Sequence, residues 1–217
     1  MLATIRQGHA GDIDPAARLI AKAFGELQAA RWLVPDKARR DTVLANHFRL
    51  ILAQALDHGV VDVIDVGLPV GDDSDVRYHL GPSPVAVAVW IDRDGPLPEL
   101  PDYDLLLEAA TGDNAGRFRL LGELFDEHQP AESHYYLALL AVHPDCQGDG
   151  LGTALVHHHL NQRPDTPVYL EASSPRSRKL YARLGWEDQG DPFPLPDGTL
   201  FWPMWRPADH TDDESLL

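Results

Sequence analysis

A glycine-bearing loop at residues 147–152 is the part of the sequence whose residue types and spacing best suit chemistry. It reads Gln-Gly-Asp-Gly-Leu-Gly and follows an apolar run that ends at Val142. Pro144 ends that run as a strand, because proline has no N–H to donate to a ladder. A helix is predicted to begin near Thr153. The glycines would then leave backbone N–H groups open at the positive end of the helix dipole, where a pyrophosphate is favoured and where Gln147 adds a side-chain donor.

Other readings of this loop are partly excluded by its context. A nucleoside triphosphate loop would place Lys and then Ser or Thr after the last glycine, but Thr153 and Ala154 stand there. A dinucleotide loop normally follows the first strand, whereas this loop lies in the last third of the chain. An ordinary tight turn explains the loop as well as a phosphate site does. Taken alone, the loop predicts only the binding of some phosphate.

The elements that position this loop alternate between strands and helices. Apolar runs predict strands at 2–6, 60–67, 84–91, 134–142, 167–172 and 199–205. Helical spacing and start signals predict helices after Asp12, after Pro35-Asp36, within 102–127, and over about 150–161 and 175–184. A hairpin around Gly71 is also expected. This order predicts an α/β (α+β) protein with one domain over 1–208 and an acidic C-terminal tail over 209–217.

Composition narrows the class of protein and its partners. Hydrophobic residues make up 44% and charged residues 24%, as in ordinary globular proteins. The formal net charge is -16, from Lys+Arg 18 and Asp+Glu 34, which argues against binding nucleic acid. Acids cluster at 72–75 and in the tail. No apolar run reaches membrane-spanning length and no secretory signal is expected, so we predict no membrane partner. The single cysteine, Cys146, favours a reducing cytoplasm and reads as structural.

Two segments together resemble the GCN5-related N-acetyltransferase (GNAT) superfamily. Residues 142–155, VHPDCQGDGLGTAL, are similar to its coenzyme signature, with Gln147, Gly150 and Gly152 at the signature positions. Residues 168–186, VYLEASSPRSRKLYARLGW, resemble its second conserved segment. Within the superfamily, the later half is most similar to puromycin N-acetyltransferase and its bacterial relatives. The resemblance implies a GNAT fold: a central mixed, mostly antiparallel sheet of about six to seven strands flanked by helices.

The resemblance also implies a donor site for acetyl-coenzyme A as cosubstrate, with no metal. The backbone of Leu140, Ala141 and Val142 would polarise the thioester carbonyl, because adjacent strands splay there in the superfamily. Ser174, which replaces the Asn of many members, and Arg178 are further expected contacts. The expected coenzyme loop consists of Gln147, Gly148, Asp149, Gly150, Leu151, Gly152 and Thr153.

Acid and base candidates follow from the chemistry of amide formation. Tyr181 matches the superfamily tyrosine placed beside the sulfur, and a tyrosine can protonate a departing thiolate. Glu171, Glu132 and His134 lie at or near the two central strands and are candidate bases, with Glu171 preferred. Each also has a structural interpretation: Tyr181 as a packed tyrosine, Glu132 as a loop residue, His134 as a strand-end polar group, and Glu171 as a satisfied strand residue.

The acceptor side is less defined by sequence. Trp32 and Trp90 are expected either to pack in the core or to line an acceptor pocket, together with Glu132 and His134. His157-His158-His159 are not expected to bind a metal, because neighbouring side chains on a helix diverge. The preferred function is direct transfer of acetyl to a primary amine of a small molecule, an antibiotic or metabolite, by a monomer or homodimer. The alternatives are an acyl-coenzyme A sensor without catalysis and a protein lysine or N-terminal acetyltransferase.

Overall fold

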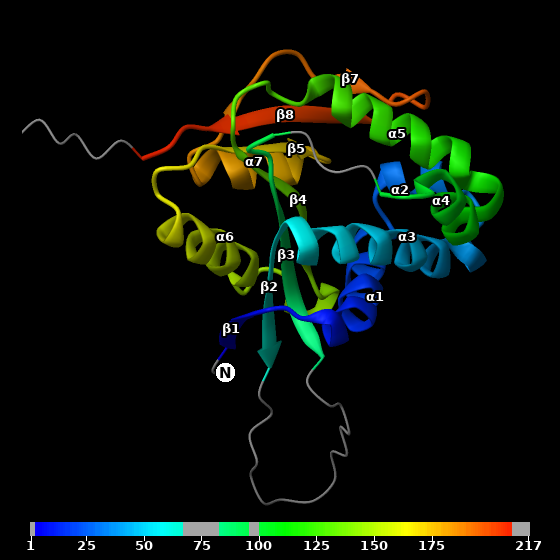
Figure 1. The fold of residues 1–217 in the computed structure, drawn as a ribbon, viewed down its shortest axis with the longest axis horizontal. Helices are drawn as coiled ribbons and strands as arrows, with labels where there is room; N and C mark the ends of the chain where they lie inside the picture. Colours follow the sequence, from blue (N-terminus) through cyan, green and yellow to red (C-terminus); the bar gives the residue numbers. More distant parts are fainter. Residues whose placement is uncertain (1–2, 67–82, 96–99, 210–217) are drawn as a thin grey trace, which may run out of the picture.

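The computed structural model describes residues 3–66, 83–95 and 100–209, and within these residues the elements follow the predicted alternation (Figure 1). The expected hairpin around Gly71, the acids at 72–75 and the tail beyond Asp209 lie outside the described residues. No helix among the described residues is long and apolar enough to cross a membrane. The strands are β1 (Ala3–Gln7), β2 (Gly59–Val66), β3 (Pro84–Asp92), β4 (Tyr135–Val142), β5 (Val168–Ala172), β6 (Glu187–Asp188), β7 (Phe193–Pro194) and β8 (Leu200–Arg206).

The helices begin and end largely where the local signals predict. They are α1 (Ile13–Phe24), α2 (Gln28–Leu33), α3 (Lys37–His58), α4 (Tyr103–Thr111), α5 (Ala115–His128), α6 (Leu151–Gln162) and α7 (Pro175–Arg183). Asp36 caps α3 by accepting a hydrogen bond from the Ala38 N–H at 2.9 Å. Gly59 follows α3, where a Cβ would lie 2.0 Å from the Trp90 carbonyl oxygen. Helix α2 was not predicted, because its six residues are too short to show a helical period.

The sheet confirms the predicted mixed, mostly antiparallel architecture. Its strands lie in the order β1-β2-β3-β4-β5-β8-β6, and β7 pairs with β8. All neighbours are antiparallel except β4 and β5. The structure has an eight-stranded sheet where six to seven strands were expected, because β6 and β7, of two residues each, carry too few residues to be recognised from sequence.

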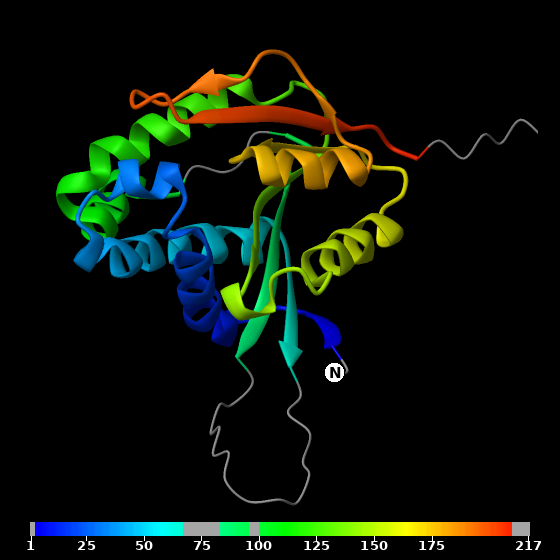
Figure 2. The same cartoon turned by 180° about the vertical axis from the view of Figure 1, so that it is seen from behind.

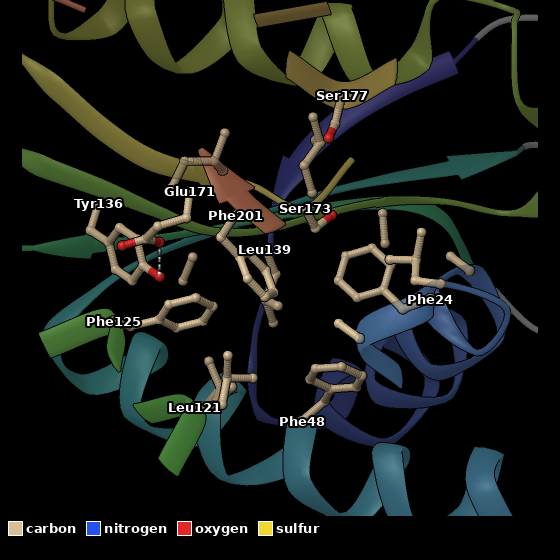
Figure 3. Close-up of a pocket in the computed structure, with 18 of the residues that line it drawn as sticks. Phe24, Phe48, Leu121, Phe125, Tyr136, Leu139, Glu171, Ser173, Ser177 and Phe201 are labelled. Atoms are coloured by element: carbon tan, nitrogen blue, oxygen red, sulfur yellow. Dashed lines mark hydrogen bonds between the residues drawn. The ribbon is translucent and has the colours of Figure 1, made fainter. Parts of the chain in front are cut away.

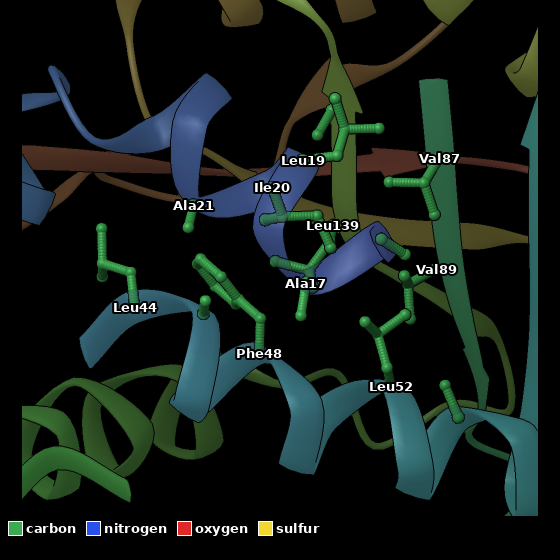
Figure 4. Packing of buried hydrophobic residues seen from close by; sticks show 14 of the residues in the cluster. Ala17, Leu19, Ile20, Ala21, Leu44, Phe48, Leu52, Val87, Val89 and Leu139 are labelled. Atoms are coloured by element: carbon green, nitrogen blue, oxygen red, sulfur yellow. The ribbon is translucent and has the colours of Figure 1, made fainter. Parts of the chain in front are cut away.

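The two faces of the sheet are covered by different helices, so the chain forms three layers (Figures 1 and 2). One cluster packs α1 and α3 against side chains such as Val87 and Val89 of β3 (Figure 4). The other packs α6 and α7 against Ala88 and Trp90, the intervening residues of β3. This alternation is the period of two that a strand imposes on its side chains.

Strand β4 carries a bulge that changes which side chains face α1 and α3. Val89 pairs with Leu139 and Trp90 with Leu137, so Ala138 has no partner on β3. As a result Ala138 and Leu139, although consecutive, both pack toward the α1–α3 layer. Strand β4 pairs with β5 only through Tyr135–Val168 and Tyr136–Tyr169. Beyond Tyr136 the two strands therefore separate. The bulge and the separation together open the sheet in the middle of β4.

Candidate functional site

A cavity of about 1400 Å³ extends from the glycine loop, past the opening between β4 and β5, to helices α4 and α5. It is lined by the residues Tyr136–Val142 of β4, by Glu171 of β5, by the first turn of α6, and by one side of α7 from Arg176 to Arg183. Side chains of α1, α3 and α5 close the opposite side (Figure 3). Segments that are far apart in sequence therefore meet around one continuous space.

The glycine loop forms the start of α6, as predicted. Gly148 and Gly150 have φ of 98° and 80°, a conformation that costs other residues energy. The N–H groups of the first turn, Leu151–Thr153, have no acceptor within the helix, as at any helix start. All residues of the predicted coenzyme loop except the exposed Asp149 line the cavity. Gln147 does so while its side chain donates to the Val142 carbonyl at 3.2 Å.

Substituting Gly150 with Ala is expected to weaken coenzyme binding. A Cβ at this position meets no atom within 4 Å, so the cost is the left-handed backbone and not a clash. That conformation costs a non-glycine residue about 1–2 kcal/mol, and relaxing it would turn the loop N–H groups away. We expect a roughly tenfold rise in the KM for acetyl-coenzyme A, measured by steady-state kinetics. Gly116→Ala, in α5 and away from the cavity lining, is the matched control and should leave KM unchanged.

The pairing of β4 with β3 determines which amides of β4 face the opening. The His143 N–H donates to the Val85 carbonyl on the β3 side at 2.7 Å. In an antiparallel ladder alternate residues direct their N–H groups to opposite sides. The N–H groups of Leu140 and Val142 therefore point toward the opening, and that of Ala141 points to β3. Ala141, the third residue of the predicted backbone site, also lines the cavity, but its N–H group does not point into it.

Glu171 is held at the opening by a tyrosine of the neighbouring strand. The Tyr136 hydroxyl donates to Glu171 Oε2 at 2.7 Å (Figure 3). The Gln129 amide donates to Oε1 at 3.3 Å. Burial of the carboxyl raises its pKa to about 7, although the hydrogen bond from Tyr136 opposes the shift. A carboxylate with a pKa near neutrality accepts a proton far more readily than an exposed one does.

Replacing Tyr136 with Phe is expected to move the pH dependence of catalysis. A base must be ionised to act, so kcat/KM should rise with pH through the pKa of Glu171, at about 7 in the unmodified protein. The lost hydroxyl removes a hydrogen bond that favours the carboxylate, so the pKa of Glu171 should rise. The ascending limb of the kcat/KM profile should therefore shift to higher pH. An unshifted limb would show that the titrating group is not Glu171.

Tyr181 lies on α7 and lines the same cavity from the other layer of the fold. It is 8% exposed, and its ring packs beside Trp186 with centroids 5.9 Å apart. Burial raises the pKa of Tyr181, because the anionic phenolate loses its solvation. The hydroxyl is therefore protonated at neutral pH, which is the form that an acid requires.

Ser174 and Arg178 both have structural partners, Ser174 in α7 and Arg178 in β6. Ser174 caps the helix by accepting from the Ser177 N–H at 3.1 Å, and it also lines the cavity. Serine and asparagine are both favoured at this helix position, which explains the exchange between them. Arg178 pairs with Asp188 instead of lining the cavity. Arg176 and Arg183 of the same helix line it, and neither was singled out from sequence.

The candidate acceptor residues are not brought to the cavity. Trp90 is fully buried on the α6 side, where it stacks on His159 at a centroid distance of 3.8 Å. Trp32, on α2, packs toward α5, where the Arg117 guanidinium lies over its ring. Glu132 is exposed, and its carbonyl contacts His134 Nδ1 at 2.6 Å. The apolar run of β3 could not show which residues face which layer, since all of them are hydrophobic.

His134 is connected to the site indirectly. It is 1% exposed, and its Nε2 lies 3.2 Å from Gln129 Oε1, while the Gln129 amide contacts Glu171. Burial lowers the pKa of His134, and the contact of its Nε2 with Oε1 places the imidazole to orient Gln129. Neither Gln129 nor Tyr136 was predicted, because their relation to Glu171 depends on tertiary packing. Tyr136 lies in the YY pair before the central apolar run, which is its only trace in the sequence.

No group of three or more His, Cys, Asp or Glu in residues 3–66, 83–95 and 100–209 is arranged to hold a metal ion. The side chains of the histidine run diverge, as expected. His157 is exposed, whereas His159 is fully buried against Trp90. Cys146 is a free, partly buried cysteine at the edge of the cavity.

Comparisons with known proteins agree with this architecture. Residues 122–206 match the acetyltransferase (GNAT) domain family. A Corynebacterium glutamicum structure described as histone acetyltransferase HPA2 and related acetyltransferase has 28% identity and a TM-score of 0.67, covering 98% of this chain and 99% of that one.

Two more distant structures share the fold. The Escherichia coli ribosomal-protein-S18-alanine N-acetyltransferase has 15% identity and a TM-score of 0.55, covering 100% of both chains. A mosquito arylalkylamine N-acetyltransferase-like protein has 14% identity and a TM-score of 0.56, covering 94% of this chain and 99% of that one. The particular similarity to puromycin N-acetyltransferase is not confirmed by these comparisons. Residues 122–206 thus carry a GNAT acetyltransferase domain match, and the chain as described has the GNAT fold.

Proposed function

We propose that the protein is an acetyl-coenzyme A-dependent N-acetyltransferase that acetylates a primary amine of a small molecule. The observation that carries the proposal is the single cavity that joins the glycine loop at α6 to Glu171 between β4 and β5. The loop suits the pyrophosphate, and the carboxyl suits the proton of an attacking amine. The single cysteine suits a reducing compartment, so we propose that the enzyme is cytoplasmic.

The transfer needs one base, one acid and one carbonyl-binding amide. Glu171 takes a proton from the ammonium group, so that the amine nitrogen can attack the acetyl carbonyl carbon. The outward N–H groups of Leu140 and Val142 stabilise the carbonyl oxygen as negative charge develops. The N–C bond forms, the C–S bond breaks with its electron pair on sulfur, and Tyr181 donates a proton to that thiolate. The second proton that the nitrogen loses on forming the amide passes through water to the Tyr181 oxygen and restores the acid, so the products are an amide, free coenzyme A thiol and the proton held by Glu171.

The donor side is assigned to residues that line the cavity near α6 and α7. Gln147 and the backbone of Gly148–Thr153 would hold the pyrophosphate, and Ser174, which lines the cavity, would lie beside the pantetheine arm. Arg176 and Arg183, which form no ion pair among the described residues, would add positive charge at that end. A helix start with open N–H groups and nearby arginines is the chemistry that an anionic nucleotide thioester requires.

The proposal is tested by mixing the purified protein with acetyl-coenzyme A and a panel of amines, then measuring thiol release. Turnover on small amines with an acetylated product identified by mass spectrometry is the expected result. Binding of acetyl-coenzyme A without thiol release on any amine would contradict it and favour a sensor. Such a sensor would also leave the near-neutral pKa of Glu171 without a use.

A second candidate function is acetylation of protein lysines or N-termini. It is favoured by the 28% identity to the Corynebacterium glutamicum structure, whose description names histone acetyltransferase. The panel therefore includes a lysine-containing peptide and a peptide with a free N-terminus. Faster turnover on either peptide than on every small amine would establish this alternative.

A further inference from the structure

The part of the cavity beyond Glu171 is lined by apolar side chains that take no part in the transfer mechanism. Side chains from α1, α3, α5, β4 and β8 surround it, and we call this space the acceptor chamber (Figure 3). Its wall is aromatic and aliphatic, and Phe125 meets Phe201 edge to face with centroids 5.1 Å apart. The six side chains that define it are Phe24, Phe48, Leu121, Phe125, Leu139 and Phe201.

The chamber holds few polar groups that could serve a hydrophilic acceptor. His47 also lines the cavity, and burial lowers its pKa to about 4, so it carries no charge at neutral pH. The carboxyl of Glu171 lies at the edge of the chamber beside Tyr136 (Figure 3). Hydroxyl groups of a sugar would remain without partners against this wall, which is unfavourable. An aromatic or branched aliphatic body would instead remove apolar surface from water.

The two ends of the cavity carry opposite charge. Exposed lining residues at the end near α6 and α7 include Arg176 and Arg183. At the other end, the exposed residues Asp102, Asp104, Glu123 and Asp126 line the cavity at α4 and α5. A further lining cation, Arg93, lies near Glu171, and within the acidic group Arg119 forms an ion pair with Asp104 at 3.0 Å. We call this end the acidic mouth.

Exposed apolar side chains lie in the acidic mouth beside its carboxylates. Tyr103 and Leu105 of α4 line it and are 41% and 66% exposed. An exposed pairing of apolar and anionic side chains suits a ligand that is both hydrophobic and cationic. The opposite charges also separate the two substrates, since the anionic coenzyme is attracted to the arginine end and repelled from the mouth.

We propose that the acceptor is a hydrophobic cationic amine without a carboxylate, which enters through the acidic mouth and places its apolar body in the acceptor chamber. This inference rests on the proposed function, because the amine is the group that Glu171 deprotonates. The mouth is anionic, so a carboxylate on the acceptor would be repelled at entry. Amines are therefore expected to be better acceptors than the corresponding amino acids.

Four amines test the class by their kcat/KM values at fixed acetyl-coenzyme A. We expect 2-phenylethylamine to exceed ethylamine roughly 10- to 100-fold, because its ring is buried. It should exceed phenylalanine, which differs by one carboxylate, and spermidine, which lacks an apolar body. Higher activity on ethylamine, phenylalanine or spermidine would overturn the inference while leaving the acetyltransferase function intact.

Charge-removing variants test whether the carboxylates of the acidic mouth attract the cationic amine. Glu123→Gln with Asp126→Asn should lower kcat/KM for 2-phenylethylamine roughly tenfold at low ionic strength, and less at high salt. The control, Asp113→Asn with Glu127→Gln, removes the same charge from exposed positions outside the cavity lining and should have no effect. Equal losses in both pairs would show that net charge, and not the mouth, is responsible.

The chamber is tested by Leu121→Asn, which keeps the size of the side chain but makes it polar. It should lower the ratio of kcat/KM on 2-phenylethylamine to kcat/KM on ethylamine roughly tenfold, whereas Leu121→Met should keep that ratio. Equal loss on both amines would contradict a contact with the apolar body.

Calorimetry with phenethyltrimethylammonium, which has no transferable proton, measures binding independently of turnover. Binding of this cation without acetyl transfer to any amine would overturn the proposed function and support the chamber. No binding of this cation, in a protein that acetylates other amines, would overturn the chamber instead.

Discussion

Replacing Glu171 with Gln is expected to lower kcat by about 10²–10⁴-fold at neutral pH, the range associated with losing a general base. Gln is nearly isosteric and can still accept the hydrogen bond from Tyr136, so the site geometry is retained. Coenzyme binding should be unaffected, because Glu171 lies beyond the opening from the glycine loop. Single-turnover kinetics with saturating acetyl-coenzyme A would measure the loss directly.

Two controls separate catalysis from folding in the Glu171→Gln protein. Glu132→Gln, at an exposed position outside the cavity lining, should retain activity, and loss there would move the base to the residue that sequence left as an alternative. The pKa of Glu171 in the folded protein is raised to about 7, so its protonated form favours folding. That stabilisation is complete below the unfolded pKa and is lost as pH rises through 7. The variant should therefore gain in Tm relative to the unmodified protein between pH 5 and pH 8.

The second large effect is expected from Tyr181→Phe, which should lower kcat by about 10²–10⁴-fold while leaving the KM for acetyl-coenzyme A little changed. The ring of Phe can keep the contact with Trp186, so the packing of α7 is preserved. What is lost is the hydroxyl that protonates the departing thiolate. Thiol release under steady state, with circular dichroism to verify folding, measures the effect.

Tyr135→Phe is the matched control for Tyr181. Tyr135 begins β4 and lies outside the cavity lining, with the Arg163 guanidinium 5.1 Å from its ring centroid. Its hydroxyl has no role in the transfer, so activity should be retained. If Tyr181→Phe also keeps the full rate, Tyr181 serves only to pack α7 and the thiolate takes its proton from another source.

The two substitutions should differ in their pH dependence. The ascending limb of kcat/KM belongs to the base, so it should disappear in Glu171→Gln and persist in Tyr181→Phe. Tyr181 has a raised pKa because of burial, so it remains protonated across the neutral range and contributes no limb there. This difference assigns the two roles without relying on the size of either rate loss.

The features that sequence determined are those encoded within a short stretch of chain. Proline and glycine set the end of β4 and the start of α6, and Asp36 and Ser174 mark helix starts through their own hydrogen bonds. The alternation of elements predicted a mixed sheet, and the pairing of two local segments pointed to a coenzyme site and to Tyr181. Each of these signals depends on neighbours a few residues apart.

The tertiary structure alone decided what surrounds the reaction centre. Tyr136 meets Glu171, which lies 35 residues away, only because β4 and β5 pair in parallel with that register. The bulge at Ala138 directs the Leu139 side chain toward the acceptor chamber. The uninterrupted apolar run of this strand gives no sign of the bulge. Sequence left Trp90 either in the core or in the acceptor pocket, and the structure buries it in the core, because the face that a strand residue takes depends on register and not on residue type. The donor side could be predicted because it is local, whereas the acceptor side is assembled by packing between distant helices.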